Sequence, residues 1–182
     1  MNPAELLTHW VEGKHRGQLV KKTADPYFTH LLAVANMAAP LMAFGFEIGI
    51  CHDLLEDTGT TAEELTAALA RFGYNAKDAD YITFTVVELT DVYTSAAFPG
   101  LTKEERKERE AQRLYKTSPA AQTLKYCDLA DNIKWVLQHD RKHARRYLAK
   151  KERLVTALTA GEPEMRRKML DIIHFSLTTL KN

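Results

Sequence analysis

The stretch Cys51-His52-Asp53-Leu54-Leu55-Glu56-Asp57-Thr58 packs one histidine and three carboxylates into six residues, directly after an apolar approach over residues 44–50. Read as a helix at about 100° per residue, the histidine and the three carboxylates fall within about 140° of arc and share one face. Aspartate and glutamate are seldom buried without a partner, so carboxylates beside an imidazole favour a bound divalent cation. The stretch therefore predicts a metal site on a helix.

The length and charge of the chain restrict the class of protein. A chain of 182 residues predicts one domain over 1–182 with a substantial core. With 25 basic and 24 acidic residues the net charge is +1, which indicates neither a nucleic-acid partner nor a membrane. The first residues lack a signal-peptide pattern, and no apolar run is long enough to span a bilayer. Two cysteines, Cys51 and Cys127, do not make a disulfide framework, so we expect a reduced, cytoplasmic setting. The sequence is also compatible with a homo-oligomer.

Capping signals and apolar spacing predict an all-α fold, a single compact helical bundle. Asp25-Pro26 is expected to open the second helix, and Thr61/Glu64 and Thr102/Glu105 fit capping boxes. Residues 91–101 are expected to form a loop. The predicted helices cover 3–15, the segment from 25–26 to about 41, the segment around His52 to about 59, 61–72, 76–90, 102–116, 118–139, 141–159 and 162–180.

Separate helices each offer an inward side chain that could bind a metal. His30 follows the apolar stripe of the second helix, and Asp128 follows that of the helix over 118–139. Together with His52 and Asp53 they supply two imidazoles and two carboxylates, which suit a transition metal such as Mn, Fe or Zn better than calcium. The two remaining carboxylates of 51–58 lie one turn further on, where they could move a proton.

This pattern resembles the signature of HD-domain metal-dependent phosphohydrolases. Within that superfamily the chain is most similar to the (p)ppGpp hydrolase domain of RelA/SpoT enzymes and to small stand-alone alarmone hydrolases. Residues 52–58 match the HDxxED stretch of that family, and Pro26-Tyr27-Phe28-Thr29-His30 matches its Pro-Tyr-x-x-His segment. The resemblance covers about residues 12–140, and the helices of 141–180 are expected to pack on this core.

The resemblance implies hydrolysis of the 3′-pyrophosphate of guanosine tetra- and pentaphosphate, with Mn²⁺ as the expected metal and Fe²⁺, Zn²⁺ or Mg²⁺ as alternatives. It implies that the metal ligands are His30, His52, Asp53 and Asp128. It also implies that Glu56 and Asp57 activate or position the attacking water. The residues that it places at the nucleotide are Lys21, Lys22, Thr90 and Asn132.

The sequence departs from the family at several places, some of which touch the expected nucleotide pocket, and the loop that carries Lys21 is one residue longer than in the family. Leu31 replaces a proline, Asp91 replaces a basic residue and Asp131 replaces a histidine. Two other functions therefore stay open: an HD phosphohydrolase for another nucleotide, such as a deoxynucleotide or NADPH, and a catalytically idle HD module that binds a nucleotide. The retained Glu56 and Asp57 argue against the idle module, because binding alone does not need them.

Overall fold

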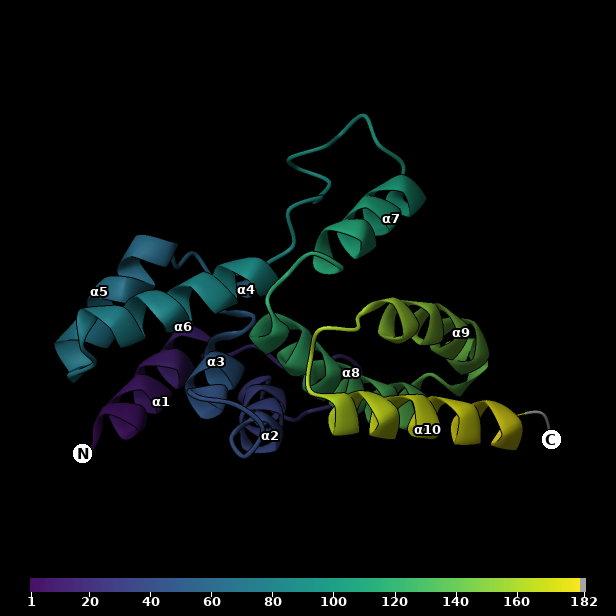
Figure 1. The fold of residues 1–182 in the computed structure, drawn as a ribbon, viewed down its shortest axis with the longest axis horizontal. Helices are drawn as coiled ribbons and strands as arrows, with labels where there is room; N and C mark the ends of the chain where they lie inside the picture. The colour runs from purple at the N-terminus through teal and green to yellow at the C-terminus, as the bar shows by residue number, and fades with distance from the viewer. Residues whose placement is uncertain (181–182) are drawn as a thin grey trace. The chain divides into compact units, whose positions relative to one another are not determined.

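The computed structural model describes residues 1–180 as helices joined by turns and loops (Figure 1), so the prediction of an all-α fold is confirmed. Within these residues the only backbone pairing of the β type is an isolated bridge between Leu19 and Pro26. None of the described helices combines the length and the apolar character that crossing a membrane requires. The helices are α1 (Pro3–Lys14), α2 (Phe28–Ala38), α3 (Gly45–Cys51), α4 (Leu54–Asp57), α5 (Ala62–Phe72), α6 (Ala76–Leu89), α7 (Lys103–Leu114), α8 (Pro119–His139), α9 (Arg141–Ala157) and α10 (Pro163–Thr179).

Two compact units divide the helices, one from Met1 to Thr90 with α1–α6 and one that begins at Asp91 and contains α7–α10. Each unit has buried apolar side chains of its own. The single domain expected over residues 1–182 stays a prediction.

In the first unit, α2 and α3 pack with their backbones in close contact. A Cβ atom added at Gly45 would lie 2.2 Å from the carbonyl oxygen of Ala38, and one added at Gly49 would lie 2.5 Å from Cα of Ala35. Distances this short leave no room for any side chain at the two glycines. The two helices that carry the predicted histidines are therefore held together along their main chains.

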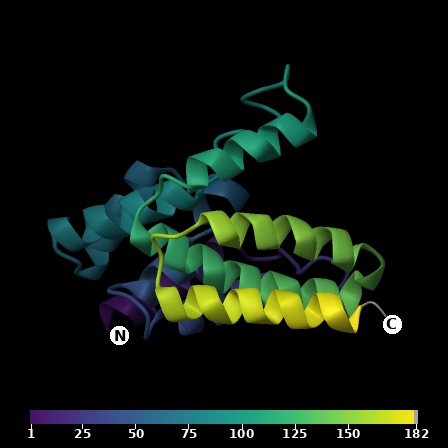
Figure 2. The ribbon, with the colours of Figure 1, turned by 45° about the vertical axis from the view of Figure 1, so that its right-hand side comes forward.

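The second unit is built on three long helices, α8, α9 and α10, which lie side by side (Figure 2). Tyr126 of α8 is fully buried among them, and its hydroxyl donates to the carbonyl oxygen of Leu158 at 2.7 Å. Leu114 at the end of α7 belongs to the same apolar cluster, together with Ile133 and Ile173. The helices of 141–180 thus pack around α8, which carries Asp128.

Several predicted helix starts are confirmed by their capping bonds. Thr102 and Glu105 form the expected capping box at α7, and Ser118 caps α8 directly before Pro119. At α10 the Glu162 carboxylate accepts hydrogen bonds from the backbone N–H groups of residues 164 and 165. These bonds satisfy N–H groups that the first turn of a helix otherwise leaves unpaired.

One predicted helix start and one predicted capping box need correction. The second helix begins at Phe28, not at Asp25-Pro26, because Asp25 accepts from the N–H of Val20 at 2.8 Å and Pro26 forms the bridge with Leu19. This pairing joins the two ends of a turn over residues 21–25, so the segment before Phe28 is not helical. At α5, Thr61 accepts from the N–H of Glu64 as predicted, whereas the Glu64 carboxylate pairs with Lys14 at 2.6 Å.

Candidate metal centre

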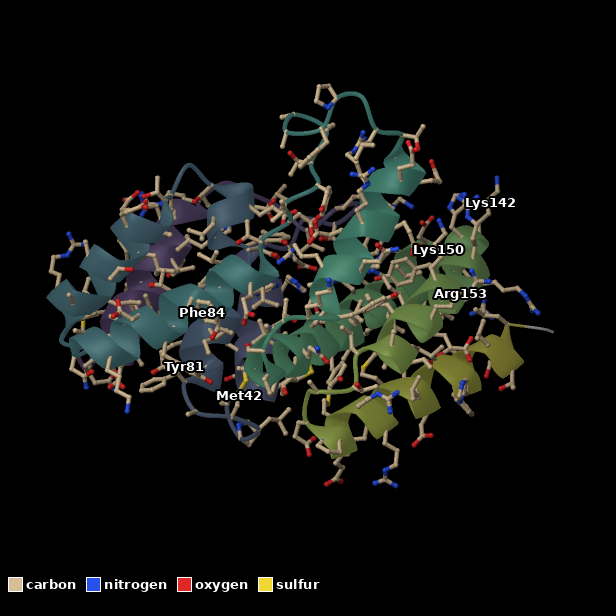
Figure 3. All side chains as sticks on the ribbon, turned by 45° about the horizontal axis from the view of Figure 1, so that its top comes forward. Met42, Tyr81, Phe84, Lys142, Lys150 and Arg153 are labelled. Atoms are coloured by element: carbon tan, nitrogen blue, oxygen red, sulfur yellow. The ribbon has the colours of Figure 1, made fainter. Side chains whose placement is uncertain are left out.

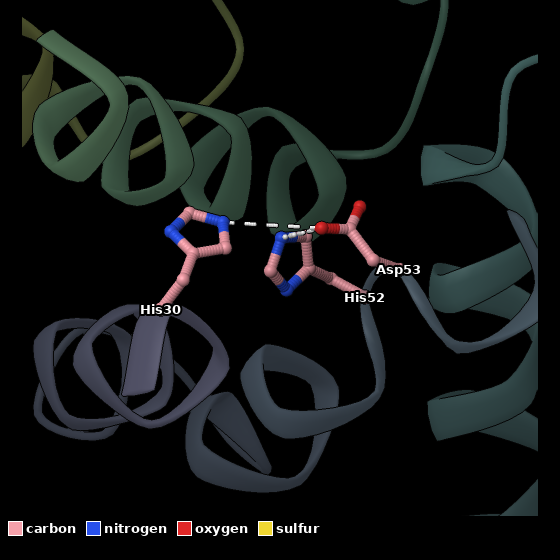
Figure 4. Close-up of side chains that lie close together, drawn as sticks. All are labelled: His30, His52 and Asp53. Atoms are coloured by element: carbon pink, nitrogen blue, oxygen red, sulfur yellow. Dashed lines mark ion pairs between the residues drawn. The ribbon is translucent and has the colours of Figure 1, made fainter. Parts of the chain in front are cut away.

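Three of the four predicted metal ligands converge in the first unit. His30 of α2, His52 and Asp53 each offer one ligand atom, and these atoms all lie within 4.8 Å of one another (Figure 4). Asp53 Oδ2 lies 3.0 Å from His52 Nε2 and 3.8 Å from His30 Nε2. Both imidazoles are buried. Two imidazole nitrogens and a carboxylate oxygen at this spacing form a donor set that suits a divalent transition metal.

The orientation of His52 supports this interpretation. Its Nδ1 lies 2.8 Å from the carbonyl oxygen of Gly49, and a carbonyl can only accept, so Nδ1 carries the proton. If the ring is neutral, Nε2 presents a lone pair to Asp53 Oδ2. Both atoms are then hydrogen-bond acceptors, and they repel each other unless a positive charge lies between them. A proton or a metal ion can supply that charge, and a backbone bond at the far nitrogen is the usual support of a metal-binding histidine.

The local backbone at these ligands differs from the prediction of one continuous helix. α3 ends at Cys51, and α4 begins only at Leu54. Asp53 has φ −102° and ψ 3°, in the sparsely populated region between helix and strand. The chain therefore turns at His52-Asp53, and this turn, not a shared helical face, directs both side chains to His30. Thr58 ends α4 by donating to the carbonyl oxygen of Leu54 at 2.5 Å.

The two carboxylates of α4 follow directly after the cluster. Glu56 is exposed, which leaves it within reach of a solute. Burial raises the pKa of Asp57 above its usual range, and the nearby charge of Asp53 raises it further. The raised pKa means that Asp57 keeps its proton to a higher pH than an ordinary aspartate does.

Asp128, the fourth predicted ligand, lies in the second unit and is buried on α8. Its Oδ2 lies 2.8 Å from the ammonium of Lys125, and its Oδ1 accepts a hydrogen bond from the amide of Asn132. Both carboxylate oxygens are thus oriented by residues one helical turn away. Its role as a ligand stays a prediction.

The other residues expected at the nucleotide occupy different settings. Lys21 and Lys22 are exposed in the loop between α1 and α2, and Lys22 has a positive φ of 63°. Thr90 closes α6 with its hydroxyl bound to the carbonyl oxygen of Val86 at 3.0 Å. These placements are compatible with their expected roles and leave those roles as predictions.

The second unit contains a basic groove that the sequence analysis missed. It has a volume of about 810 Å³ and is lined by residues of the 91–95 segment, α7, α8 and α9. Figure 3 labels Lys150 and Arg153, two of its residues on α9. Seven basic side chains line it against four acidic ones, a balance that favours an anionic ligand. The basic residues are Lys103, Arg106, Lys107, Lys125, Lys150, Lys151 and Arg153.

Lys151 is the most unusual of these cations. Desolvation of its ammonium lowers its pKa to about 8, and the positive charge of Lys125 contributes to the shift. The sequence contained a signal for this residue, because Lys151 continues the helical spacing of the buried Leu148 and Val155. Lys151 therefore lies on the apolar stripe of α9 and is not part of a solvated basic face.

Replacing Lys151 by methionine is expected to raise the free energy of unfolding at pH 7 by about 1–3 kcal/mol, because the apolar chain is kept and the poorly solvated charge is removed. The pKa of Lys151 is lower in the folded state than in the unfolded state. Wild-type stability should therefore rise as pH increases from about 8 toward the unfolded value, where the unfolded chain binds more protons. Urea unfolding at pH 7 and pH 10 measures both effects. Lys150→Met, at an exposed neighbour, is the control; a loss of stability in Lys151→Met at pH 7 would contradict the expectation.

The helical fold and the cluster of His30, His52 and Asp53 are features that the resemblance to HD domains led us to expect. Among solved structures the chain is similar to that of a metazoan ortholog of SpoT, which is described as hydrolysing ppGpp and playing a role in starvation responses. The TM-score is 0.77 at 22% identity, over 97% of this chain and 96% of that chain. The expected resemblance to this kind of hydrolase domain is thereby confirmed at the level of the fold.

A curated relative is similar over a shorter stretch. The chain is 45% identical over 58 residues to a probable GTP pyrophosphokinase of Mycobacterium leprae (strain TN). The match covers 29% of this chain and 7% of the length of that protein. No family model matches the chain.

Proposed function

We propose that this chain is a metal-dependent phosphohydrolase that removes pyrophosphate from the 3′ position of guanosine 3′,5′-bis(diphosphate). The observation that carries the proposal is the convergence of His30, His52 and Asp53 within a fold shared with a ppGpp-hydrolysing relative. Fold alone does not fix a reaction, so the argument rests on what these side chains can do.

His30, His52 and Asp53 would hold the metal ion, with Asp128 as the proposed fourth ligand and Mn²⁺ as the proposed ion. A divalent metal at such a site supplies Lewis acidity toward a phosphoryl oxygen and lowers the pKa of water. The chain itself then has to orient the water, accept its proton and bind the phosphate groups.

Glu56 is the proposed proton acceptor, because it is exposed on α4 immediately after the cluster. Its carboxylate oxygens would take the proton of the attacking water, while Asp57 positions that water. The water would attack the phosphorus bonded to the ribose 3′-oxygen, and the bond between that oxygen and phosphorus would break. The proton would then pass from the carboxylate to the ribose 3′-oxygen, directly or through solvent, which returns Glu56 to its charged form.

Phosphate groups of the nucleotide that are not cleaved need cations of their own. Lys125 both lines the basic groove and pairs with Asp128, so the groove begins beside the proposed fourth ligand. We propose that the ammonium and guanidinium groups of the groove bind phosphate groups of an anionic ligand. A separate proposal is that Lys21 and Lys22 bind the guanine of the nucleotide. A bound phosphate would also stabilise the charged form of Lys151.

The substrate is expected to be cleaved selectively. Guanosine 3′,5′-bis(diphosphate) incubated with the chain and Mn²⁺ should yield GDP and pyrophosphate, whereas GTP should survive because it has no 3′ group to cleave. Chromatography of nucleotide products over a panel that includes deoxynucleotides and NADPH measures this selectivity.

Each other result on that panel has a definite meaning. Equal turnover of many nucleotides, or cleavage of deoxynucleotides or NADPH alone, would replace the alarmone by another substrate. Tight binding of a nucleotide without any hydrolysis would assign the chain to the idle HD modules.

A cytoplasmic location belongs to the same proposal. Cys51 and Cys127 are buried free thiols, and burial raises the pKa of each well above its usual range. Such thiols are unreactive small core residues and do not require an oxidising compartment.

A further inference from the structure

Tyr27 contacts the one carboxylate oxygen that faces both histidines. Its hydroxyl donates to Asp53 Oδ2 at 2.6 Å, and this is the oxygen that lies 3.0 Å from His52 Nε2 and 3.8 Å from His30 Nε2. A carboxylate free to rotate about its side-chain bonds would present either oxygen to the imidazoles. The hydrogen bond from Tyr27 selects one of these orientations.

The phenol can only act as a donor in this setting. A tyrosine hydroxyl ordinarily loses its proton only near pH 10, so it keeps that proton across the physiological range. A neutral hydroxyl that donates to a carboxylate makes a strong, short hydrogen bond without adding charge to the site.

The ring of Tyr27 is itself fixed on two sides. It stacks on His15 with centroids 5.7 Å apart and lies 5.5 Å from the ring of His30. Its backbone N–H donates to the carbonyl oxygen of Gln18 at 2.9 Å. The Gln18 side chain accepts from His15 Nδ1 at 2.7 Å and donates to the carbonyl oxygen of Asp57 at 2.8 Å. The loop before α2 is thereby tied to α4.

We infer that Tyr27 is a positioning residue for the metal: its hydroxyl holds the Asp53 carboxylate toward His30 and His52 and so raises the affinity of the site. This role rests on the proposed metal-dependent function. Partners that hydrogen-bond to metal ligands commonly change metal affinity by about 10–100-fold when they are removed. Helical periodicity could not identify Tyr27, because this residue precedes the helix that carries His30.

The test is Mn²⁺ binding to the full chain without nucleotide, measured by calorimetry for the wild type, Tyr27→Phe and Tyr74→Phe. The Tyr74 hydroxyl donates to Glu47 at 3.0 Å, so Tyr74→Phe removes a comparable tyrosine–carboxylate bond outside the cluster. Tyr27→Phe should weaken Mn²⁺ binding by about 10–100-fold, and Tyr74→Phe should leave it unchanged. Excess Mn²⁺ should restore hydrolysis by Tyr27→Phe.

The rise in melting temperature that Mn²⁺ produces gives the same comparison for a variant that is less stable. Wild-type affinity in Tyr27→Phe, or equal weakening in both variants, would overturn the positioning role while leaving the proposed hydrolase intact. A wild-type chain that binds no Mn²⁺ would overturn the metal site and this role with it. Binding of Mn²⁺ without hydrolysis of any nucleotide would remove the proposed function and keep the role of Tyr27 in metal affinity.

Discussion

Replacing Glu56 by glutamine is expected to lower the turnover number by about 10²–10⁴, while the metal and the substrate still bind. The amide keeps the shape of the side chain but cannot accept the proton of the attacking water. The loss corresponds to a barrier increase of about 3–5 kcal/mol. Single-turnover rates, measured alongside the metal content of the purified variant, test the expectation.

A matched control for this variant is Glu12→Gln, which makes the same chemical change at an exposed position on α1. It should retain the wild-type rate. Loss of metal together with activity in Glu56→Gln would make Glu56 a ligand and not the proton acceptor. An unchanged rate would transfer the acceptor role to Asp57, whose pKa is raised by burial.

Replacing Asp53 by asparagine is expected to weaken metal binding by more than about 100-fold, because loss of an outer hydrogen-bonding partner alone costs about 10–100-fold and Asp53 is a proposed direct ligand. The amide preserves the volume of the side chain and removes the negative charge between the two imidazoles. Metal content after dialysis and Mn²⁺ titration measure the change, and hydrolysis should disappear in parallel.

Asp80→Asn provides the control for this variant, since Asp80 is exposed on α6. Retention of a stoichiometric metal ion by Asp53→Asn would remove Asp53 from the ligand set. The melting temperature without metal adds a second readout. It should fall only slightly, because the neutral amide can still accept the hydrogen bond from Tyr27.

Local chemistry explains why most helix boundaries could be predicted. Ser118-Pro119, Thr102 with Glu105, and Glu162-Pro163 each begin a helix through bonds between residues at most three positions apart. Such bonds depend on neighbours in the sequence, so the pattern of residue types is sufficient to locate them. The start of α2 was misplaced because it depends on backbone pairing between Leu19 and Pro26 across a loop.

The residues of the candidate site also divide into those that the local sequence pattern predicts and those that depend on contacts with distant parts of the chain. His30 and Asp128 could be chosen because they lie on apolar stripes, and His52 because of its acidic neighbours. Helical periodicity could not predict the turn at Asp53. A short polar residue such as aspartate can adopt a helical or a non-helical backbone conformation, and contacts with the surrounding structure decide between the two. Tyr27 lies before α2, so helical periodicity does not predict which way its side chain points. Lys151 has basic neighbours on α9, and a run of basic residues is typical of a solvated face.

The close contact of α2 with α3 has a consequence for which ions the site can accept. At Gly49 the main chain rests on Ala35, and the same glycine supplies the carbonyl oxygen that orients His52. The separation of the two imidazoles is therefore set by main-chain atoms that cannot move apart without opening the core. A fixed separation between two metal-binding imidazoles selects ions by radius and preferred coordination geometry. An ion that needs a wider spacing cannot be accommodated by moving the two helices apart.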